Sequence, residues 1–283
     1  MEQAITIQKK QWAMEKKRNG RIRTAAKSRS NTAIRILLLA LGAITILAFL
    51  TFDYKDIDLG RAVADTLSNF RTVFFLPHLS RGTVVNLLHQ LFITFCLGVL
   101  STILGMILAF FCALLCARNI ADDRVSGLVK SVVALVRAIP TVLWVLIFAV
   151  SAGLGSVAAV VGLTFHSFAY LTKVYAESIE EIDEGTIEAL KACGAGFGQI
   201  VTQAILPSSL SSLIAWTFMR FEINFTNAIA MGAAAGAGGI GFDLYMAGSF
   251  YFDLHEMGFL TYVAVITVVV LELISTKIKL WAK

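Results

Sequence analysis

Four charged or amide residues interrupt an apolar run near residues 208–230, where such side chains are costly to place in a lipid bilayer. Arg220, Asn224 and Asn227 fall on one stripe of a helix, and Glu222 points roughly to the opposite side. A guanidinium presents a planar fork of donors that matches the oxygens of an oxyanion. The pattern predicts either an anion-attracting position beside a water-filled path or a structural pair that holds neighbouring helices together.

A glycine-rich string, GAAAGAGGIG, follows at residues 232–241. It lacks the Lys-Ser/Thr of a phosphate-binding loop and follows no strand, so we expect no nucleotide site in this chain. A glycine-rich break can point backbone N–H groups at an anion, and small residues let helices approach closely. Gly238, Gly239 and Gly241 are therefore candidates for an anion path or for tight packing.

The sequence gives little support for catalytic chemistry. His166 lies within an apolar run and is interpreted as a buried, hydrogen-bonded histidine or as a ligand contact. The string HEMGF at residues 255–259 has Phe259 where a zinc protease requires its second histidine. The four cysteines show no metal-binding spacing, and no nucleophile elbow occurs. We expect no catalytic residues and no metal site.

The elements that position these residues follow from composition. The chain of 283 residues is 57% hydrophobic and 15% charged, with a mean hydropathy of +0.77, which is typical of an integral membrane protein. A helix crosses the hydrocarbon core with about 20 apolar residues. Six such segments are predicted, near residues 34–52, 84–115, 132–152, 155–175, 208–230 and 259–276. Pro140 should kink the third of them.

Charge predicts the orientation. Nine Lys and Arg residues precede the first segment, and only Glu2 and Glu15 oppose them, so the positive-inside rule places the N-terminus in the cytoplasm. Six crossings return the C-terminus to the same side, and the connection 231–258, expected outside, contains no Lys or Arg. Residues 1–32 are predicted as a basic cytoplasmic arm that meets anionic lipid rather than nucleic acid. The outer segment 53–83 has the spacing of an amphipathic surface or linker helix.

The polar segment 176–207 lies between the fourth and fifth predicted spans and is assigned to the cytoplasm. Gly185 is expected to break the preceding helix, and Thr186 to cap a new one. Three spaced glycines should end that helix, and Pro207 suits the first turn of the next span. The pattern favours a short helix that lies across the inner membrane face and docks a partner.

These residues resemble the EAA motif of ABC importer permeases, in which Glu-Ala-Ala is followed at fixed spacing by Gly and Ile-x-Leu-Pro. The matching residues are Glu188, Ala189, Gly194, Leu206 and Pro207, whereas Leu190 and Ala204 depart from the motif. In that family the loop forms a coupling helix that inserts into a groove of an ATPase subunit, and the resemblance implies the same role here.

A second resemblance covers roughly residues 84–276. The string RFEINFTNAIAMGAAAGAGGIG at 220–241, with RAI at 137–139, GLG at 153–155 and His166, is similar to the phosphonate importer permeases of the PhnE family. Methionine-type permeases have a similar glycine turn. The resemblance implies an all-α, six-helix type I importer permease fold, MetI-like, with residues 33–283 as the membrane domain.

The resemblance also implies a function. The chain would be a multi-pass permease subunit in the cytoplasmic (inner) membrane that translocates a phosphonate, or a related phosphorus oxyanion, without an ATPase site of its own. Its partners would be a second permease chain, identical or related, two ATPase subunits that bind ATP and Mg, an extracytoplasmic substrate-binding protein and the bilayer. The alternatives are an importer of another substrate such as methionine, and a membrane-embedded enzyme or assembly factor.

Overall fold

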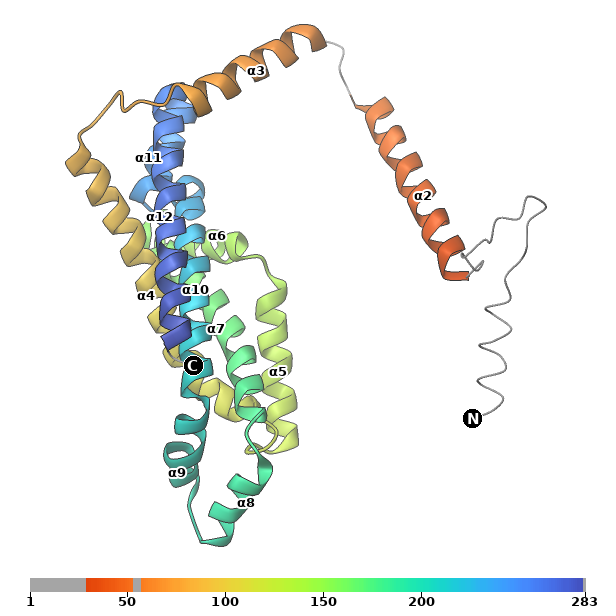
Figure 1. Ribbon diagram of the computed structural model, residues 1–283, viewed down its shortest axis with the longest axis vertical. Helices are drawn as coiled ribbons and strands as arrows, with labels where there is room; N and C mark the ends of the chain where they lie inside the picture. The colour runs from red at the N-terminus through yellow and green to blue at the C-terminus, as the bar shows by residue number, and fades with distance from the viewer. Residues whose placement is uncertain (1–28, 53–56, 282–283) are drawn as a thin grey trace, which may run out of the picture. The chain divides into compact units, whose positions relative to one another are not determined.

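The structure is a computed structural model that describes residues 29–52 and 57–281, and this part of the chain is helical with turns between the helices (Figure 1). In chain order the elements are α2 (Arg29–Thr51), α3 (Leu59–Phe75), α4 (Val84–Cys116), α5 (Asp123–Ala138), α6 (Thr141–Ala152), α7 (Ser156–Glu180), α8 (Glu184–Ala192), α9 (Phe197–Ile200), the π-helical segment η1 (Val201–Ile205), α10 (Leu206–Ala235), α11 (Gly239–Tyr245), the π-helical segment η2 (Met246–Phe250) and α12 (Leu254–Trp281). Two compact units divide at residues 63 and 64.

The first unit contains α2, whose stretch 32–51 has a mean hydropathy of 2.5 and no buried residue. A helix that is apolar all round and is not covered by the described residues of its unit is suited to lipid or to another protein. The predicted basic arm lies almost wholly outside the described residues.

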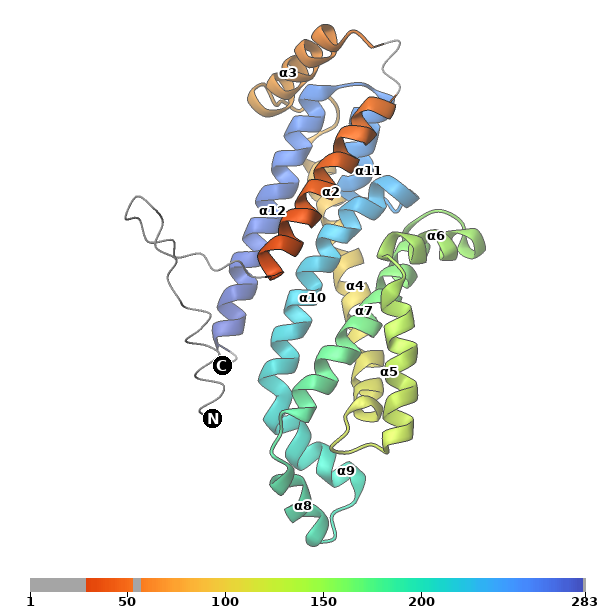
Figure 2. The same ribbon diagram turned by 90° about the vertical axis from the view of Figure 1, so that its right-hand side faces the viewer.

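The second unit is built around α4, α7 and α10, which pack on one another along their length (Figures 1 and 2). Glycines mark the crossings: a Cβ on Gly105 would lie 2.7 Å from the Ser167 Cβ, and one on Gly98 would lie 3.2 Å from the Phe225 Cα. Lipid gives no hydrophobic drive between helices, so close backbone approach is a main source of their packing energy. Small residues therefore hold this core together.

The third predicted span differs from the structure. The helix begins at Asp123, capped by the Asp122 carboxylate, which accepts from the Arg124 N–H at 2.9 Å, so the predicted start near residue 132 is wrong. The predicted kink is confirmed and is large: α5 and α6 meet at 87° around Pro140. Because proline offers no N–H to the Val136 carbonyl, the Trp144 indole donates to that carbonyl instead, at 3.0 Å.

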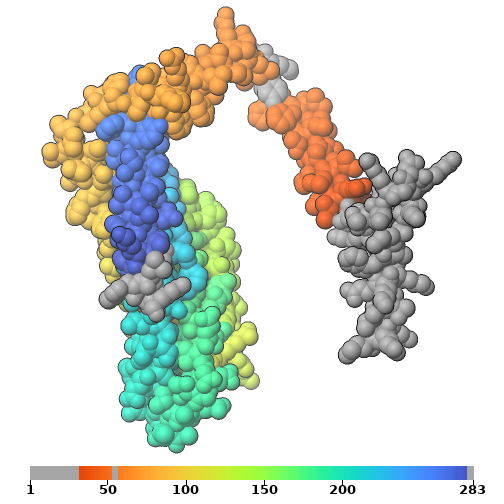
Figure 3. Space-filling view, in the orientation of Figure 1, coloured from red at the N-terminus to blue at the C-terminus, as the bar shows by residue number. Residues whose placement is uncertain are grey.

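Five helices of the described residues are long and apolar enough to span a membrane, and the count reaches six if the bent pair α5 and α6 is one span. The helix predicted in the segment 53–83 is α3, and its end near residue 74 packs on α12, where the Tyr262 hydroxyl donates to the Phe74 carbonyl at 2.8 Å. At the opposite end of the second unit, α8 and α9 protrude beyond the bundle (Figure 3).

Candidate functional site

Arg220 is the centre of a buried polar cluster that joins three helices. It lies on α10 with 2% of its surface exposed, and Asn224 one turn later is fully buried. The Arg220 Nε donates to the Ser167 hydroxyl on α7 at 3.0 Å, and a terminal nitrogen lies 3.0 Å from the His166 Nδ1. The Asn224 amide donates to Ser167 and to Thr102 of α4, both at 2.8 Å. We call these five residues the Arg220 cluster.

The chemistry of the cluster follows from its donors and acceptors. An arginine only donates hydrogen bonds, so the His166 Nδ1 must accept, and the imidazole is neutral with its proton on Nε2. No carboxylate of the described residues lies within 4.0 Å of Arg220, and the ring of Tyr170 faces its guanidinium at 5.4 Å. The buried cation is thus stabilised by dipoles and an aromatic face. Of the two roles considered for Arg220, this geometry favours the structural one, in which the residue holds neighbouring helices together.

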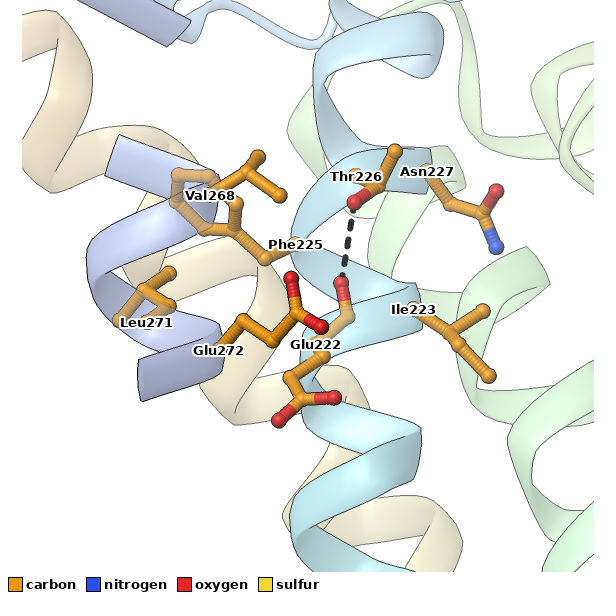
Figure 4. A pocket seen from close by; sticks show the side chains of 8 residues that line it. All are labelled: Glu222, Ile223, Phe225, Thr226, Asn227, Val268, Leu271 and Glu272. Atoms are coloured by element: carbon orange, nitrogen blue, oxygen red, sulfur yellow. Dashed lines mark hydrogen bonds between the residues drawn. The ribbon is translucent and has the colours of Figure 1, made fainter. Parts of the chain in front are cut away.

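Asn227 does not join the Arg220 cluster. It makes no side-chain hydrogen bond with the described residues and borders a cavity of about 280 Å³ beside Glu222. Figure 4 shows the Glu272 carboxylate reaching from α12 toward α10, where Glu222 lies. Glu272 was not among the site residues predicted from the sequence, although a lone carboxylate within the sixth apolar segment indicates a functional position.

The glycine-rich break between α10 and α11 is a packing joint. Gly236, Gly238 and Gly239 have positive φ angles of 61°, 80° and 74°, which glycine adopts without steric cost. The Gly239 N–H donates to the Gln90 side chain at 3.1 Å and the Ile240 N–H to the Thr94 hydroxyl at 3.0 Å. These first N–H groups of α11 are occupied by α4, so the geometry favours packing over an anion site.

At Gly241 the backbones of α11 and α10 approach each other closely within this joint. A Cβ on Gly241 would lie 1.8 Å from the Ile229 carbonyl oxygen, a distance that no side chain tolerates. The polar residues of α4 that complete the joint, Gln90 and Thr94, were missed in the sequence, where they stand inside an apolar run.

The polar segment 176–207 contains the last turn of α7, then α8, α9, η1 and the first two residues of α10. The helix α8 begins at Glu184 with Asp183 at its N-cap, so the predicted cap at Thr186 is wrong. Its end is a Schellman motif: the Gly194 N–H donates to the Lys191 carbonyl and the Ala195 N–H to the Leu190 carbonyl, both at 3.0 Å. Gly194 has a φ of +82°, which explains why a glycine stands there.

One face of α8 is anchored and the other is exposed. Ile187 is 2% exposed and Leu190 packs on the same core, whereas Glu188 and Ala189 face outward. Phe197 at the start of α9 leaves 54% of its surface exposed. The segment is therefore a fixed platform with an unpartnered outer surface.

Leu206 and Pro207 stand where α9 joins α10. Leu206 packs on the core, and Pro207 is exposed in the first turn of α10. The first turn of α10 is not the start of a separate helix, because α9, the π-helical η1 and α10 form one continuous helix from Phe197 to Ala235. Proline lacks the N–H for a regular turn, and the Leu206 N–H donates to the Val201 carbonyl, five residues back.

Comparisons with known proteins agree with this architecture. A family profile described as "Binding-protein-dependent transport system inner membrane component" matches residues 101–279, which is more than half of the chain. The chain is 31% identical over 153 residues to the "Phosphate-import permease protein PhnE" of Mycolicibacterium smegmatis, a match that covers 54% of this chain and 29% of that protein. It is 32% identical over 152 residues to the "Phosphite transport system permease protein PtxC" of Stutzerimonas stutzeri, covering 53% and 55% of the two chains. The chain thus spans at most about half of the length of these two relatives.

Solved structures show the same fold. A chain of the inward-facing MetNI methionine ABC transporter superposes with a TM-score of 0.62 at 24% identity, covering 70% of this chain and 96% of that one. At this identity the likeness shows the fold alone. The all-α, MetI-like permease fold predicted from the sequence is confirmed.

Proposed function

The chain belongs to the family of binding-protein-dependent transport system inner membrane components, and we propose on this premise that it is the permease subunit of an ABC importer for a phosphorus oxyanion, such as a phosphonate or phosphite. Two permease chains, identical or related, would enclose the path, and an extracytoplasmic binding protein would deliver the substrate. Two separate ATPase subunits would supply ATP hydrolysis.

The α8–α9 platform is the observation that carries the mechanism. Ile187 and Leu190 anchor α8 to the core, and the Schellman motif at Gly194 fixes its end. An element transmits a displacement only if it is anchored to the helices that must move. On the exposed side of the platform, Glu188 and Phe197 offer contacts to a partner. The ATPase must bind the platform differently in its open and closed states, since otherwise ATP could not bias the permease.

A set of contacts ties the platform to the bundle. Just before α8, the Glu180 carboxylate accepts from the Lys130 ammonium at 2.8 Å and from the Arg118 N–H at 2.9 Å. The Asn119 side chain donates to the Ile179 carbonyl at 2.8 Å. These contacts join the end of α7, directly before α8, to α5 and to the turn that follows α4.

The proposed orientation places α8, α9 and both termini in the cytoplasm. The basic residues before α2 and the absence of Lys and Arg from residues 231–258 support this orientation. The substrate class rests on the two relatives named for phosphate import and phosphite transport. The "Probable D-methionine transport system permease protein MetI" of Haemophilus influenzae, 26% identical over 195 residues, keeps methionine as the second candidate.

The test is ATP hydrolysis in proteoliposomes that contain the permease, its ATPase and its binding protein. We expect binding protein loaded with phosphonate or phosphite to stimulate hydrolysis, and methionine not to do so. Stimulation by methionine alone would overturn the substrate class and leave the importer architecture intact.

Variants of the platform test the coupling role. Glu188→Ala removes an exposed charge, and its control is Glu177→Ala on α7, an exposed glutamate that forms an ion pair with Lys173. Gly194→Ala strains the end of α8, and its control is Gly127→Ala, where a Cβ meets nothing within 4 Å. Only the platform variants should lose stimulation while assembled complex is retained. Equal stimulation in all four variants would refute coupling through this loop.

A further inference from the structure

A cavity of about 390 Å³ lies at the end of the second unit opposite α8 and α9, between the first turns of α4 and α12, α11 and η2 (Figure 1). We call it the Glu256 cavity. Its lining includes two carboxylates, Asp243 and Glu256, with Arg81, Asn86 and His89 near them. No residue of this cavity takes part in the Arg220 cluster or the α8–α9 platform.

Glu256 is a buried carboxylate with an unused oxygen. It is 7% exposed, and its Oε1 accepts from the Arg81 backbone N–H at 3.3 Å. Its Oε2 is buried and accepts no hydrogen bond from the described residues. The Arg81 guanidinium lies 3.7 Å away, beyond hydrogen-bond distance, and is shared with Asp253 at 3.5 Å and with the ring of Tyr251 at 4.3 Å. A buried carboxylate oxygen that accepts no hydrogen bond destabilises the protein, so a further donor at this oxygen would be favourable.

Asp243 adds a second negative charge. It is half-buried on α11, and its carboxylate makes no hydrogen bond or ion pair with the described residues. Burial, followed by the charge of Glu256, raises the pKa of the Asp243 carboxyl above its ordinary value. Two carboxylates against one arginine leave the lining with a net charge of −1, and Asp253 beside Arg81 adds another negative charge.

This charge selects the kind of group that the cavity can bind. An oxyanion would be repelled, so the cavity does not suit the proposed substrate. Among the described residues no group of three His, Cys, Asp or Glu side chains is arranged to hold a metal ion. An ammonium or guanidinium donates several hydrogen bonds and carries the complementary charge.

We propose that the Glu256 cavity receives a lysine or arginine side chain of the substrate-binding protein. The inference rests on the proposed function, because the orientation argued above places this end of the bundle outside, where the binding protein docks. A basic side chain entering the cavity would supply the donor that the Glu256 Oε2 lacks and neutralise Asp243. Such a contact would orient the binding protein over the permease.

The experiment measures the affinity of the loaded binding protein for the complete importer in lipid nanodiscs. Asp243→Asn and Glu256→Gln each remove one charge with little change of shape, and Asp65→Asn on the exposed face of α3 is the matched control. We expect each cavity variant to weaken binding by about tenfold or more, and the control to leave it unchanged. Asp243→Lys should abolish binding, and a Lys→Glu or Arg→Glu change at one position of the binding protein should restore it.

The outcomes separate this inference from the proposed function. If the binding protein stimulates ATP hydrolysis but the cavity variants bind it as well as the wild type does, the cavity assignment fails and the importer function stands. If EDTA weakens wild-type binding as much as Asp243→Asn does, the cavity holds a metal ion and the assignment is overturned. If no binding protein stimulates the wild type, the proposed function itself fails. Because Glu256→Gln also alters a buried site, Asp243→Asn decides the case if Glu256→Gln does not assemble.

Discussion

Ser167→Ala is the sharpest test of how the Arg220 cluster stabilises the bundle. The hydroxyl accepts from the Arg220 Nε at 3.0 Å and from the Asn224 amide at 2.8 Å, and it donates to the Leu163 carbonyl at 2.6 Å. The substitution removes a single oxygen and leaves a very small space. Its effect therefore reports the hydrogen bonds rather than a cavity.

The magnitude follows from the two bonds that cross between helices. A hydrogen bond to a charged group contributes about 1.5–3 kcal/mol, and neutral bonds between membrane helices average about 0.6 kcal/mol. Asn224 keeps its bond to Thr102, whereas the Arg220 Nε has no second acceptor among the described residues. We expect a loss of about 2–3 kcal/mol, or about 4–12 °C in the Tm of a unit of this size.

Thermal unfolding of the purified permease in detergent measures this loss. The control is Ser131→Ala on α5, an exposed serine whose hydroxyl donates only to the Gly127 carbonyl within its own helix. A Tm change no larger than that of the control would refute the structural role of the cluster. If the KM for transport rises while the Tm stays unchanged, the cluster instead belongs to the substrate path.

Three further predictions concern other parts of the second unit. Gly241→Ala should cost about 1–3 kcal/mol by overpacking against an α10 carbonyl, whereas Gly127→Ala should not destabilise, and unfolding of the two variants compares them. Glu180→Gln should cost under about 1 kcal/mol, because the ion pair it loses is partly exposed, yet it should reduce stimulated ATP hydrolysis if α8 transmits motion through this contact. A hydrogen bond from the Glu256 N–H lowers the pKa of the Asp253 carboxyl below its ordinary value of 3.8, so its contribution to stability is complete above that value and is lost as the pH falls through the lower folded value. Asp253→Asn should therefore flatten the change in Tm between about pH 6 and pH 3, and an unchanged slope would contradict this reasoning.

Much of the architecture could be predicted from local sequence. A helix must offer about 20 apolar residues to cross the hydrocarbon core, so the long spans near α4, α7, α10 and α12 were visible without a structure. The bend at Pro140 and the turn at Gly194 were predictable for the same kind of reason. Proline lacks an N–H and glycine accepts a positive φ, and both properties belong to the residue itself.

The sequence also determined which residues share a face of one helix, but not what lies opposite that face. The helical period placed Arg220, Asn224 and Asn227 on one stripe. Only the packing of α4 and α7 brought Ser167 to Arg220 and Thr102 to Asn224. The same packing left Asn227 outside the Arg220 cluster. Partners from distant segments depend on helix crossings, which in turn depend on how closely small residues let backbones approach. The capping of α11 by α4, the approach of Glu272 to α10 and the Glu256 cavity were therefore decided by the tertiary structure alone.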